Sequence, residues 1–398
     1  MNAQPNVPKI AIACGGTGGH LFPGIAVGRQ LVQHGCAVTL LISPKDVDQQ
    51  AVSGILELQI VKLPAVALQR GSRLAFMQGF VRSYVAARRM FKEAPHHAAL
   101  AMGGFTSVPP VLAARQLGAK AFLHESNTIP GRANRALLRF VDAAFVGFPE
   151  TLGRLKAKQS VATGTPVREE FRALDVQESR RQLGLDPARP VVLVMGGSQG
   201  ASGINQLLIR SLPLLKQQAP DWQWLHLAGA NDVEQVRSAY ASSGLTAVVH
   251  PFFASMEIAL SAADAAVARA GASSMAEFAA LKLPVVLVPL PTAADNHQFF
   301  NARAFEASGA ARLLDQKSAT PEMLLGALRA LVSDATVRSR MQEALGRWHK
   351  PDAAANIAAQ ILASLPADMR RNAISASGIG IYPVPERASF PTQVEVLQ

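Results

Sequence analysis

The chain has 398 residues, 49% of them hydrophobic and 17% charged, with a formal net charge of +11. This composition is typical of a globular protein with well-formed cores and argues against a disordered chain, and the length suits two domains. The basic balance favours a phosphorylated substrate, an anionic lipid or nucleic acid as partner, but three tyrosines, three tryptophans and no zinc-finger spacing make nucleic acid the least favoured, and we expect none.

Cysteine use and hydropathy bear on the compartment. Cys14 and Cys36 form no C-x-x-C or metal-binding pattern, which suits a reducing cytosol. Residues 1–9 contain no apolar signal core, and the longest apolar runs, such as 284–291, are far too short to span a membrane. The sequence therefore predicts a protein that is soluble or bound to a membrane surface.

The first unit of the chain predicts an anion site. A buried strand at 9–13 leads into a glycine turn at 15–19, and a helix follows with Pro23 in its first turn. Glycines let the backbone approach a ligand, and a helix N-terminus carries partial positive charge, so the turn suits phosphate. His20 lies in the same turn. Its cationic form should be disfavoured there, so it would stay neutral and could accept a proton.

Strands, turns and helices then alternate along the first half, which is typical of a parallel sheet with helices on both faces. The expected strands and helices follow each other closely, and two of the strands end in polar turns, at 103–107 and 124–127. The expected strands are 37–42, 98–102, 121–124 and 143–146, and the expected helices are 24–33, 74–92, 110–117 and 132–140.

A seam at 161–168 separates this half from a second one. A short strand ends there in Gly164, Thr165 and Pro166, and the pattern restarts with a strand at 190–195 and a glycine turn at 196–200. Two similar doubly wound domains joined at such a hinge would place their ligand sites face to face across a cleft. We predict domains at 1–165 and 166–345, a helical segment at 346–366 and a disordered tail at 367–398.

A second candidate anion site lies at 268–277, where a strand ends and a helix opens. The N–H groups of the helix start would hold a diphosphate, and Glu277 would accept hydrogen bonds from ribose hydroxyls. Ser274 and Glu277 also have the spacing of a capping box, which is the favoured interpretation from the residues alone. A polar cluster at 295–298 follows another strand, at the end where open sheets bind ligands.

Seven motifs stand in one order along the chain: Gly15–His20 with Phe22-Pro23-Gly24, Met102-Gly103-Gly104-Phe105-x-Ser107, His124-Glu125-x-Asn127, Gly164-x-Pro166-Val167-Arg168, Gly196-Gly197-Ser198-Gln199-Gly200, Arg269-x-Gly271-Ala272 with Glu277, and His297-Gln298-x-x-Asn301-Ala302. Taken together, they resemble the motifs of the MurG family of bacterial glycosyltransferases, which are GT-B enzymes of family 28. The resemblance covers about residues 9–345. It implies two Rossmann-like domains and a C-terminal helix that returns to the N-terminal domain. We expect no cofactor or metal.

The implied reaction is an inverting transfer of N-acetylglucosamine (GlcNAc) from UDP-GlcNAc. The implied acceptor is the C4 hydroxyl of MurNAc in undecaprenyl-pyrophosphoryl-MurNAc-pentapeptide (lipid I), and the product is lipid II for peptidoglycan. A base must take the proton of the attacking hydroxyl. His20 is the first candidate and Glu125 the second, although His20 could instead be a packed or phosphate-contacting histidine.

The resemblance also implies individual contacts to the donor. Asn127 and Gln298 would contact the sugar, Arg168 and Ser198 would approach UDP, and Phe253 stands where a backbone contact to uracil falls. At 126, 273–274 and 297 the chain departs from residues common in the family. The full set of implied substrate contacts is Thr17, Gly18, Gly19, Asn127, Arg168, Ser198, Phe253, Ala272, Ser273, Ser274, Met275, Ala276, Glu277 and Gln298.

Two further sequence features concern a possible metal site and a possible membrane contact. Asp46-Val47-Asp48 has the D-x-D spacing of metal-dependent transferases, but it lies in the first domain and a solvated loop is the favoured interpretation. The segment 69–92 interleaves basic and apolar residues, which suits an interface helix on anionic lipid, or else an ordinary core-facing helix. The expected membrane contacts are Leu74, Phe76, Met77, Phe80, Arg82, Arg88 and Arg89, and the helix 132–139 adds Arg132, Arg135 and Arg139.

A lipid-borne acceptor implies a peripheral protein on the cytoplasmic face of the inner membrane, with cell-wall synthesis and division proteins as further partners. Two alternatives stay open. One is another UDP-sugar enzyme on the same frame, such as a glycolipid galactosyltransferase or a UDP-GlcNAc 2-epimerase. The other is a non-catalytic UDP-sugar sensor.

Overall fold

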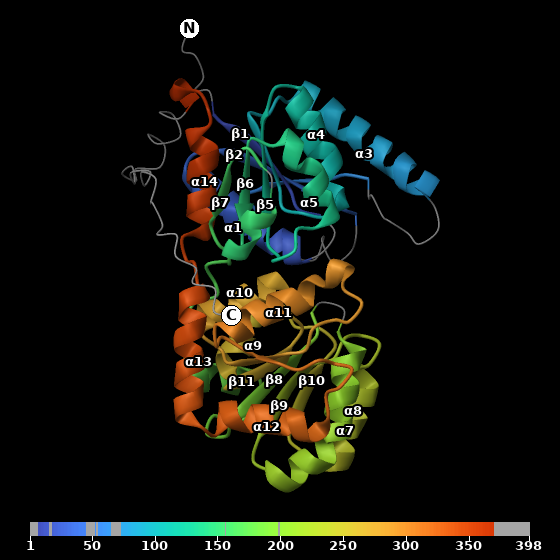
Figure 1. Ribbon diagram of the computed structural model, residues 1–398, viewed down its shortest axis with the longest axis vertical. Helices are drawn as coiled ribbons and strands as arrows, with labels where there is room; N and C mark the ends of the chain where they lie inside the picture. Colours follow the sequence, from blue (N-terminus) through green and yellow to red (C-terminus); the bar gives the residue numbers. More distant parts are fainter. Residues whose placement is uncertain are drawn as a thin grey trace, which may run out of the picture.

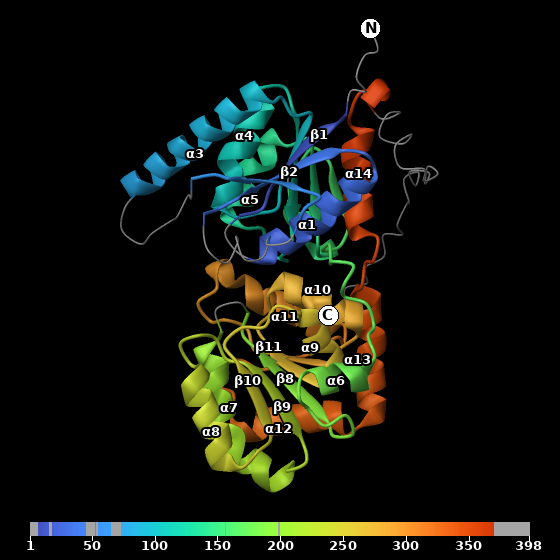
Figure 2. The same ribbon diagram turned by 180° about the vertical axis from the view of Figure 1, so that it is seen from behind.

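The computed structural model describes residues 7–15, 18–44, 52, 55–64, 73–155, 157–197 and 200–369. These residues form two all-parallel β-sheets with helices packed around each, one above the other in Figure 1 and seen from behind in Figure 2. The α/β class with two doubly wound units is therefore confirmed.

The first sheet has the strand order β3-β2-β1-β4-β5-β6-β7. Ile10 and Ile12 of β1 face the core beneath α1, whereas Ala11 and Ala13 face the core beneath α4, because successive side chains of a strand point to opposite faces. Its elements are β1 (Lys9–Ala13), α1 (Gly18–Gln33), β2 (Ala37–Ile42), β3 (Gln59–Lys62), α3 (Arg73–Glu93), β4 (Ala98–Ala101), η1 (Phe105–Ser107), α4 (Val108–Gln116), β5 (Lys120–Glu125), α5 (Arg132–Leu137), η2 (Leu138–Phe140), β6 (Ala143–Val146), η3 (Pro149–Arg154) and β7 (Ser160–Ala162).

The second sheet has the strand order β10-β9-β8-β11-β12-β13 and one continuous core. The sequence missed its edge strand β13, which is too short to show a pattern, and the polar helix α6. Its elements are α6 (Val176–Gln182), β8 (Val191–Met195), α7 (Ser202–Gln218), β9 (Gln223–Leu227), α8 (Val233–Ser243), β10 (Ala247–His250), α9 (Met256–Ala262), β11 (Ala265–Ala268), α10 (Ala272–Leu281), β12 (Val285–Leu287), η4 (Ala294–Asn296), α11 (His297–Ala307), β13 (Arg312–Leu313), α12 (Pro321–Val332) and α13 (Ala335–Trp348).

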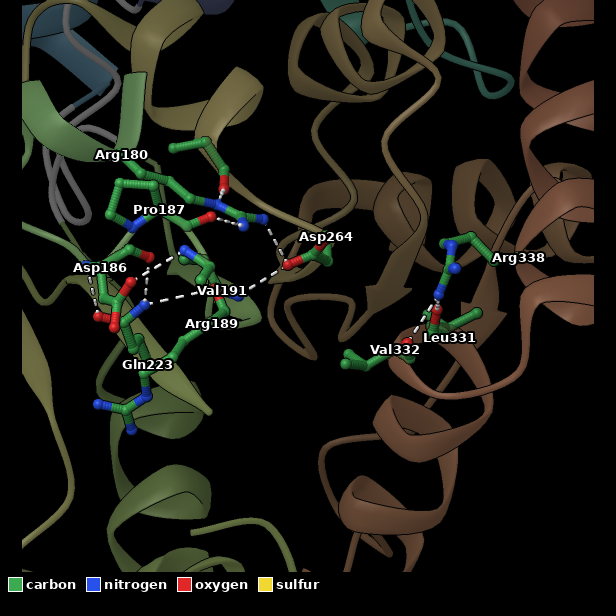
Figure 3. A network of polar contacts seen from close by, with 12 residues as sticks. Arg180, Asp186, Pro187, Arg189, Val191, Gln223, Asp264, Leu331, Val332 and Arg338 are labelled. Carbon is green, nitrogen blue, oxygen red and sulfur yellow. Dashed lines mark hydrogen bonds and ion pairs between the residues drawn. The ribbon is translucent and has the colours of Figure 1, made fainter. Parts of the chain in front are cut away.

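A polar network fixes the amino ends of this second sheet (Figure 3). Arg180 of α6 is buried and pairs with Asp264 at 2.7 Å, and the same carboxylate accepts from the Val191 N–H at 2.8 Å. Arg338 of α13 donates to the last carbonyls of α12. A buried charge requires such partners, so Arg180 anchors α6 to the sheet, and Arg338 ties α13 to the end of α12.

The segment predicted to be helical over 346–366 contains the end of one helix and a second helix, with a break between them. Helix α13 ends at Trp348 beside the second sheet, and α14 (Ala353–Ala363) packs on α1 of the first, with Ile357 and Ile361 fully buried (Figures 1 and 2). Pro351 lies in the break, where it lacks an N–H and disfavours a helical conformation in the preceding residue.

The predicted tail begins with an ordered turn. Residues 367–369 are helical, which corrects the expectation of disorder from 367 onwards, and Met369 packs against the core beneath α1. Residues 370–398 lie outside the described part of the chain.

Candidate functional site

Loops from the carboxyl ends of strands in both sheets meet between the two sheets. The Ser273 hydroxyl at the start of α10 donates to the Gly19 carbonyl at 2.7 Å, and Arg135 of α5 pairs with Asp295 at 2.6 Å. Helices α10 and α11 lie on the side of the lower unit that faces the upper one in Figure 1. Open α/β sheets bind their ligands at this edge, so the candidate site lies here.

Helix α1 begins at Gly18, so the prediction that Pro23 lies in its first turn is wrong. Pro23 lies inside the helix and has no N–H to donate to the Gly19 carbonyl one turn earlier. The Ser273 hydroxyl from the other unit donates to that carbonyl. The proline thus leaves a backbone acceptor that the second unit satisfies.

His20 lies in the first turn of α1, against the glycine turn that follows β4. A Cβ atom added to Gly103 would lie 2.8 Å from both Cδ2 and Nε2 of the His20 ring, and Gly103 has φ +115°. Only glycine suits this backbone at this distance from the ring. The glycine turn after β4 therefore lies directly against the ring of His20.

Glu125 forms hydrogen bonds with the loop that follows β5 and with α5. It is buried, and it accepts four hydrogen bonds, from the Asn127 N–H at 2.9 Å, Asn127 Nδ2 at 3.1 Å, the Gly131 N–H at 2.8 Å and Asn134 Nδ2 at 2.8 Å. A carboxylate has about four acceptor positions, and all are in use. Its geometry suits a residue that shapes this loop, and we do not carry Glu125 forward as a base.

Asn301 of α11 was quoted as a motif residue but not predicted as a site residue. It is fully buried, and its amide joins the loop after β5 to the loop after β11. The Asn301 Oδ1 atom accepts from the N–H and the hydroxyl of Thr128, at 2.9 and 3.0 Å. Its Nδ2 donates to Asn127 Oδ1 at 3.0 Å and to the Ala270 carbonyl at 3.1 Å. Its place in the 297–302 motif was the only sequence signal.

Helix α10 has no capping box, so that interpretation of Ser274 and Glu277 is wrong. Its N-cap is Gly271, which offers no side chain, and no side-chain cap bond forms. The first N–H groups of an α-helix have no partner within the helix, and this helix start lies against the other unit, where Ser273 contacts Gly19. This leaves the start of α10 available to an anion.

The remaining residues predicted on α10 differ in their exposure. Met275 is fully buried and its N–H donates to the Gly271 carbonyl at 3.0 Å, so it contributes no group to a ligand. Ala272 and Ala276 line a cavity of about 20 Å³ beside Trp348. Ser273, Ser274 and Glu277 are half-buried and carry the polar side chains of this segment.

Glu277 and Arg168 carry opposite charges, and neither side chain has a hydrogen-bond partner among the described residues. Burial raises the pKa of Glu277 to about 7, against the lowering effect of Arg168 and with a further rise from Glu257. The Arg168 guanidinium lies over the rings of Phe22 and Phe171, 4.2 and 4.9 Å from their centroids, and its Nε is buried without a partner. Both groups can therefore bind a ligand without breaking internal hydrogen bonds.

Two other predicted donor contacts, Gln298 and Phe253, follow strands of the second sheet at their carboxyl ends. Gln298 accepts the Leu290 N–H at 3.0 Å through Oε1, which turns its NH2 group away from that loop. Phe253 is half-buried, its ring centroid 5.5 Å from that of His250. Thr17 and Ser198, predicted as substrate contacts, and the Asp46–Asp48 pair lie outside the described residues. Within the described ranges no three His, Cys, Asp or Glu side chains are grouped as metal ligands.

Helix α3 presents a separate apolar surface, and its amino-terminal end projects from the upper unit (Figures 1 and 2). Leu74, Met77, Val81 and Val85 lie on one side of the helix and are 71%, 54%, 52% and 57% exposed. We call these four residues the α3 stripe. No helix in the described part of the chain is both long and apolar enough to cross a bilayer.

Some residues expected at this surface lie elsewhere. Phe76 and Phe80 turn inward, and the Phe76 ring packs edge-on against Phe105 at 5.5 Å. Arg132 and Arg135 pair with Asp295 of the second unit, at 3.3 and 2.6 Å. The basic residues of α3 that were expected at this surface are Arg82, Arg88 and Arg89, and Arg89 pairs with Glu93 at 2.9 Å.

Comparison with known families identifies two matching profiles. Residues 10–146 match the glycosyltransferase family 28 N-terminal domain, and residues 191–360 match the glycosyltransferase family 28 C-terminal domain. Together the two profiles span most of the chain.

Sequence relatives that cover most of this chain share one name. Two relatives named UDP-N-acetylglucosamine--N-acetylmuramyl-(pentapeptide) pyrophosphoryl-undecaprenol N-acetylglucosamine transferase come from Acidithiobacillus ferrooxidans and Xanthomonas axonopodis pv. citri. The first is 37% identical over 88% of this chain and 96% of its own length, and the second is 38% identical over 91% and 84%. The solved structure of Acinetobacter baumannii MurG matches with a TM-score of 0.69 and 29% identity, over 89% of this chain and 99% of that one.

Proposed function

The chain belongs to glycosyltransferase family 28, and on that premise we propose that it transfers GlcNAc from UDP-GlcNAc to the C4 hydroxyl of MurNAc in lipid I, which forms lipid II. The observation that carries this proposal is the 37–38% identity, over nearly the whole chain, to relatives named for that transfer. The charged groups between the two units support it, because they suit a nucleoside diphosphate sugar.

The second unit would hold the donor. The free N–H groups at the start of α10 and the Arg168 guanidinium suit the diphosphate, because both offer donors and positive charge to an anion. Glu277 would accept from the ribose hydroxyls, and Ser198 and Phe253 complete the proposed contacts to UDP. We place the boundary between acceptor-side and donor-side domains near residue 165, and the end of the second domain near 345.

The first unit would hold the acceptor and the base. Gly18, Gly19 and Thr17 would lie at the reacting sugars and the acceptor diphosphate. The MurNAc hydroxyl attacks C1 of GlcNAc, the C1–O bond to UDP breaks with inversion, and His20 takes the hydroxyl proton. Donors at the start of α10 would stabilise the charge that develops on UDP.

Product analysis tests the proposed reaction. Incubation with UDP-GlcNAc and a lipid I analogue should release UDP and form a disaccharide-lipid in equal amounts. UDP release without the disaccharide-lipid would contradict it. Formation of UDP-N-acetylmannosamine would instead favour an epimerase, and a solved UDP-N-acetylglucosamine 2-epimerase shares the fold at 13% identity with a TM-score of 0.65. Saturable donor binding without turnover would favour a sensor.

Donor binding should release a proton. The pKa of Glu277 is raised to about 7, so in the free protein this carboxyl is largely protonated at pH 6 and largely ionised at pH 8. Ribose hydroxyls that donate to Glu277 favour its ionised form. We therefore expect UDP-GlcNAc to bind more weakly at pH 6 than at pH 8, with proton release near pH 6 measured by calorimetry in buffers of different ionisation enthalpy.

Two substitutions check this linkage. Glu277→Gln should bind UDP-GlcNAc more weakly and without proton release. Glu257→Gln should shift the pH dependence to lower pH, because Glu257 raises the pKa of Glu277. Proton release that persists in Glu277→Gln would show that another group is responsible.

The α3 stripe would bind the membrane that carries the acceptor. We propose that the protein lies on the cytoplasmic face of the inner membrane, next to cell-wall synthesis and division proteins. Apolar side chains flanked by arginines suit the surface of an anionic bilayer. The inward turn of Phe76 and Phe80 leaves the four stripe residues, together with Arg82, Arg88 and Arg89, as the proposed contacts.

A vesicle-binding measurement tests the stripe. Leu74→Glu/Met77→Glu should weaken binding to anionic vesicles about tenfold or more, because it removes buried apolar area and adds repulsive charge. Met323→Glu is the matched control, since Met323 is exposed on α12 of the other unit and should leave vesicle binding unchanged. Equal binding of the stripe variant and the control would contradict the proposal.

A further inference from the structure

The loop after β5 and helix α11 share one amide network. Asn127 on the loop is half-buried, and Asn301 on α11 is fully buried. The two amides contact each other through Asn301 Nδ2 and Asn127 Oδ1, at 3.0 Å. They come from different sheets, so this contact exists only while the two units lie together.

Backbone groups fix which way the Asn301 amide points. The Thr128 N–H can only donate, so the atom that faces it at 2.9 Å must be Oδ1 of Asn301. The Ala270 carbonyl can only accept, so the atom that faces it at 3.1 Å must be Nδ2. Asn301 therefore has one allowed orientation, and both of its N–H groups are used.

The same reasoning fixes Asn127. It receives a hydrogen bond from Asn301 Nδ2, so its oxygen must point there, and its Nδ2 points to the Glu125 carboxylate at 3.1 Å. An ionised carboxylate only accepts, so the Glu125 end requires the same orientation independently. One of the two N–H groups on Asn127 Nδ2 then remains without a partner among the described residues.

We infer that Asn301 and Glu125 are positioning residues that make Asn127 present a single N–H donor to an oxygen of the donor sugar. This inference rests on the proposed function, and it adds which residues orient the Asn127 amide toward the donor sugar. Ala270 directly precedes Gly271, the N-cap of α10, so Asn301 also ties the sugar contact to the proposed diphosphate site.

Asn301→Asp is the sharpest test, because it keeps the acceptor for Thr128 and removes both donors. Asn127 would then lie between two carboxylates and direct both N–H groups to them, which leaves only its oxygen for the sugar. We expect the Kd of UDP-GlcNAc to rise about tenfold, the effect of one lost hydrogen bond, while the Kd of UDP changes less than twofold. Equal changes for the two ligands would overturn the inference, because a structural defect affects both.

Further variants separate positioning from stability. Asn301→Ala should give the same selective loss of UDP-GlcNAc binding, and it replaces Asn301→Asp in the test if the aspartate variant does not fold. Asn127→Ala should also give it, and Asn127→Ala/Asn301→Asp should lose no more than Asn127→Ala alone. Thr128→Val is the matched control: it removes only the hydroxyl bond to Asn301 and should lower stability without changing the ratio of the two Kd values. A changed ratio in Thr128→Val, or additive losses in the double variant, would overturn the inference.

Comparing UDP-GlcNAc with UDP-glucose identifies which oxygen of the donor sugar accepts from Asn127. If the acetamido carbonyl is the acceptor, Asn301→Asp should weaken UDP-GlcNAc and leave UDP-glucose unchanged, whereas a ring hydroxyl would weaken both. Both results support the inference. A wild-type chain that bound neither UDP nor UDP-GlcNAc would overturn the proposed function itself, and the inference with it.

Discussion

Replacing His20 with alanine should lower kcat about 100- to 10,000-fold, the usual contribution of a positioned general base. His20 lies in the first turn of α1, next to the turns proposed to hold the reacting sugars. The Kd of UDP-GlcNAc should change little, because the proposed donor contacts come mostly from the second unit. Steady-state transfer to a lipid I analogue, together with calorimetric donor binding, measures both quantities.

His34→Ala is the matched control for this prediction. His34 follows the carboxyl end of the same helix, and its ring hydrogen-bonds the Gln30 carbonyl at 2.7 Å, so its loss should leave kcat unchanged. Full turnover by His20→Ala would exclude the base role. A loss of donor binding equal to the loss of kcat would instead assign His20 to substrate contact.

The second large effect is expected at Gly103. Alanine there would place its Cβ 2.8 Å from two atoms of the His20 ring, on a backbone with φ +115°. The ring must shift, and a displacement of about 1 Å at a reacting group can lower the rate about 100-fold. The strained backbone should also lower the free energy of unfolding by about 1–3 kcal/mol. Thermal or urea unfolding and kcat should therefore both fall.

Gly118→Ala separates the effect of backbone strain from the effect of contact with His20. Gly118 has φ +94°, but a Cβ there would meet nothing within 4 Å. It should reproduce much of the loss of stability and leave kcat unchanged. If Gly103→Ala lost stability without losing kcat, contact with His20 would not matter to the reaction.

The sequence predicted the strands and helices of this fold well because the local pattern of apolar and polar residues indicates them. Short apolar runs such as 191–195 are buried on both sides in a parallel sheet, so they show no alternation and stand out from their polar surroundings. Strand β13 was missed because two residues show no pattern. The helical segment expected at 346–366 is divided because Pro351 lies in it and disfavours a helix despite the alanine-rich composition around it.

The sequence was weaker where a residue's role depends on partners far along the chain. Ser274 and Glu277 have capping-box spacing, yet the N-cap is Gly271, three residues before Ser274, and no side-chain cap bond forms. Glu125, the second candidate base, lies at the end of a strand, yet its four acceptor positions are filled by Asn127, Gly131 and Asn134. Spacing along the chain cannot reveal such saturation, because it arises from groups brought together by folding.

By itself, the sequence determined the α/β class, the glycine turns at strand ends, and the motifs that resemble one family. These depend on local conformation and on residue identity. Only the tertiary structure decided that Gly103 lies against His20, that Ser273 bonds the carbonyl left by Pro23, and that Asn301 orients Asn127. Each of these contacts joins segments from different strand ends or different sheets, so its energy depends on distances that no local pattern encodes.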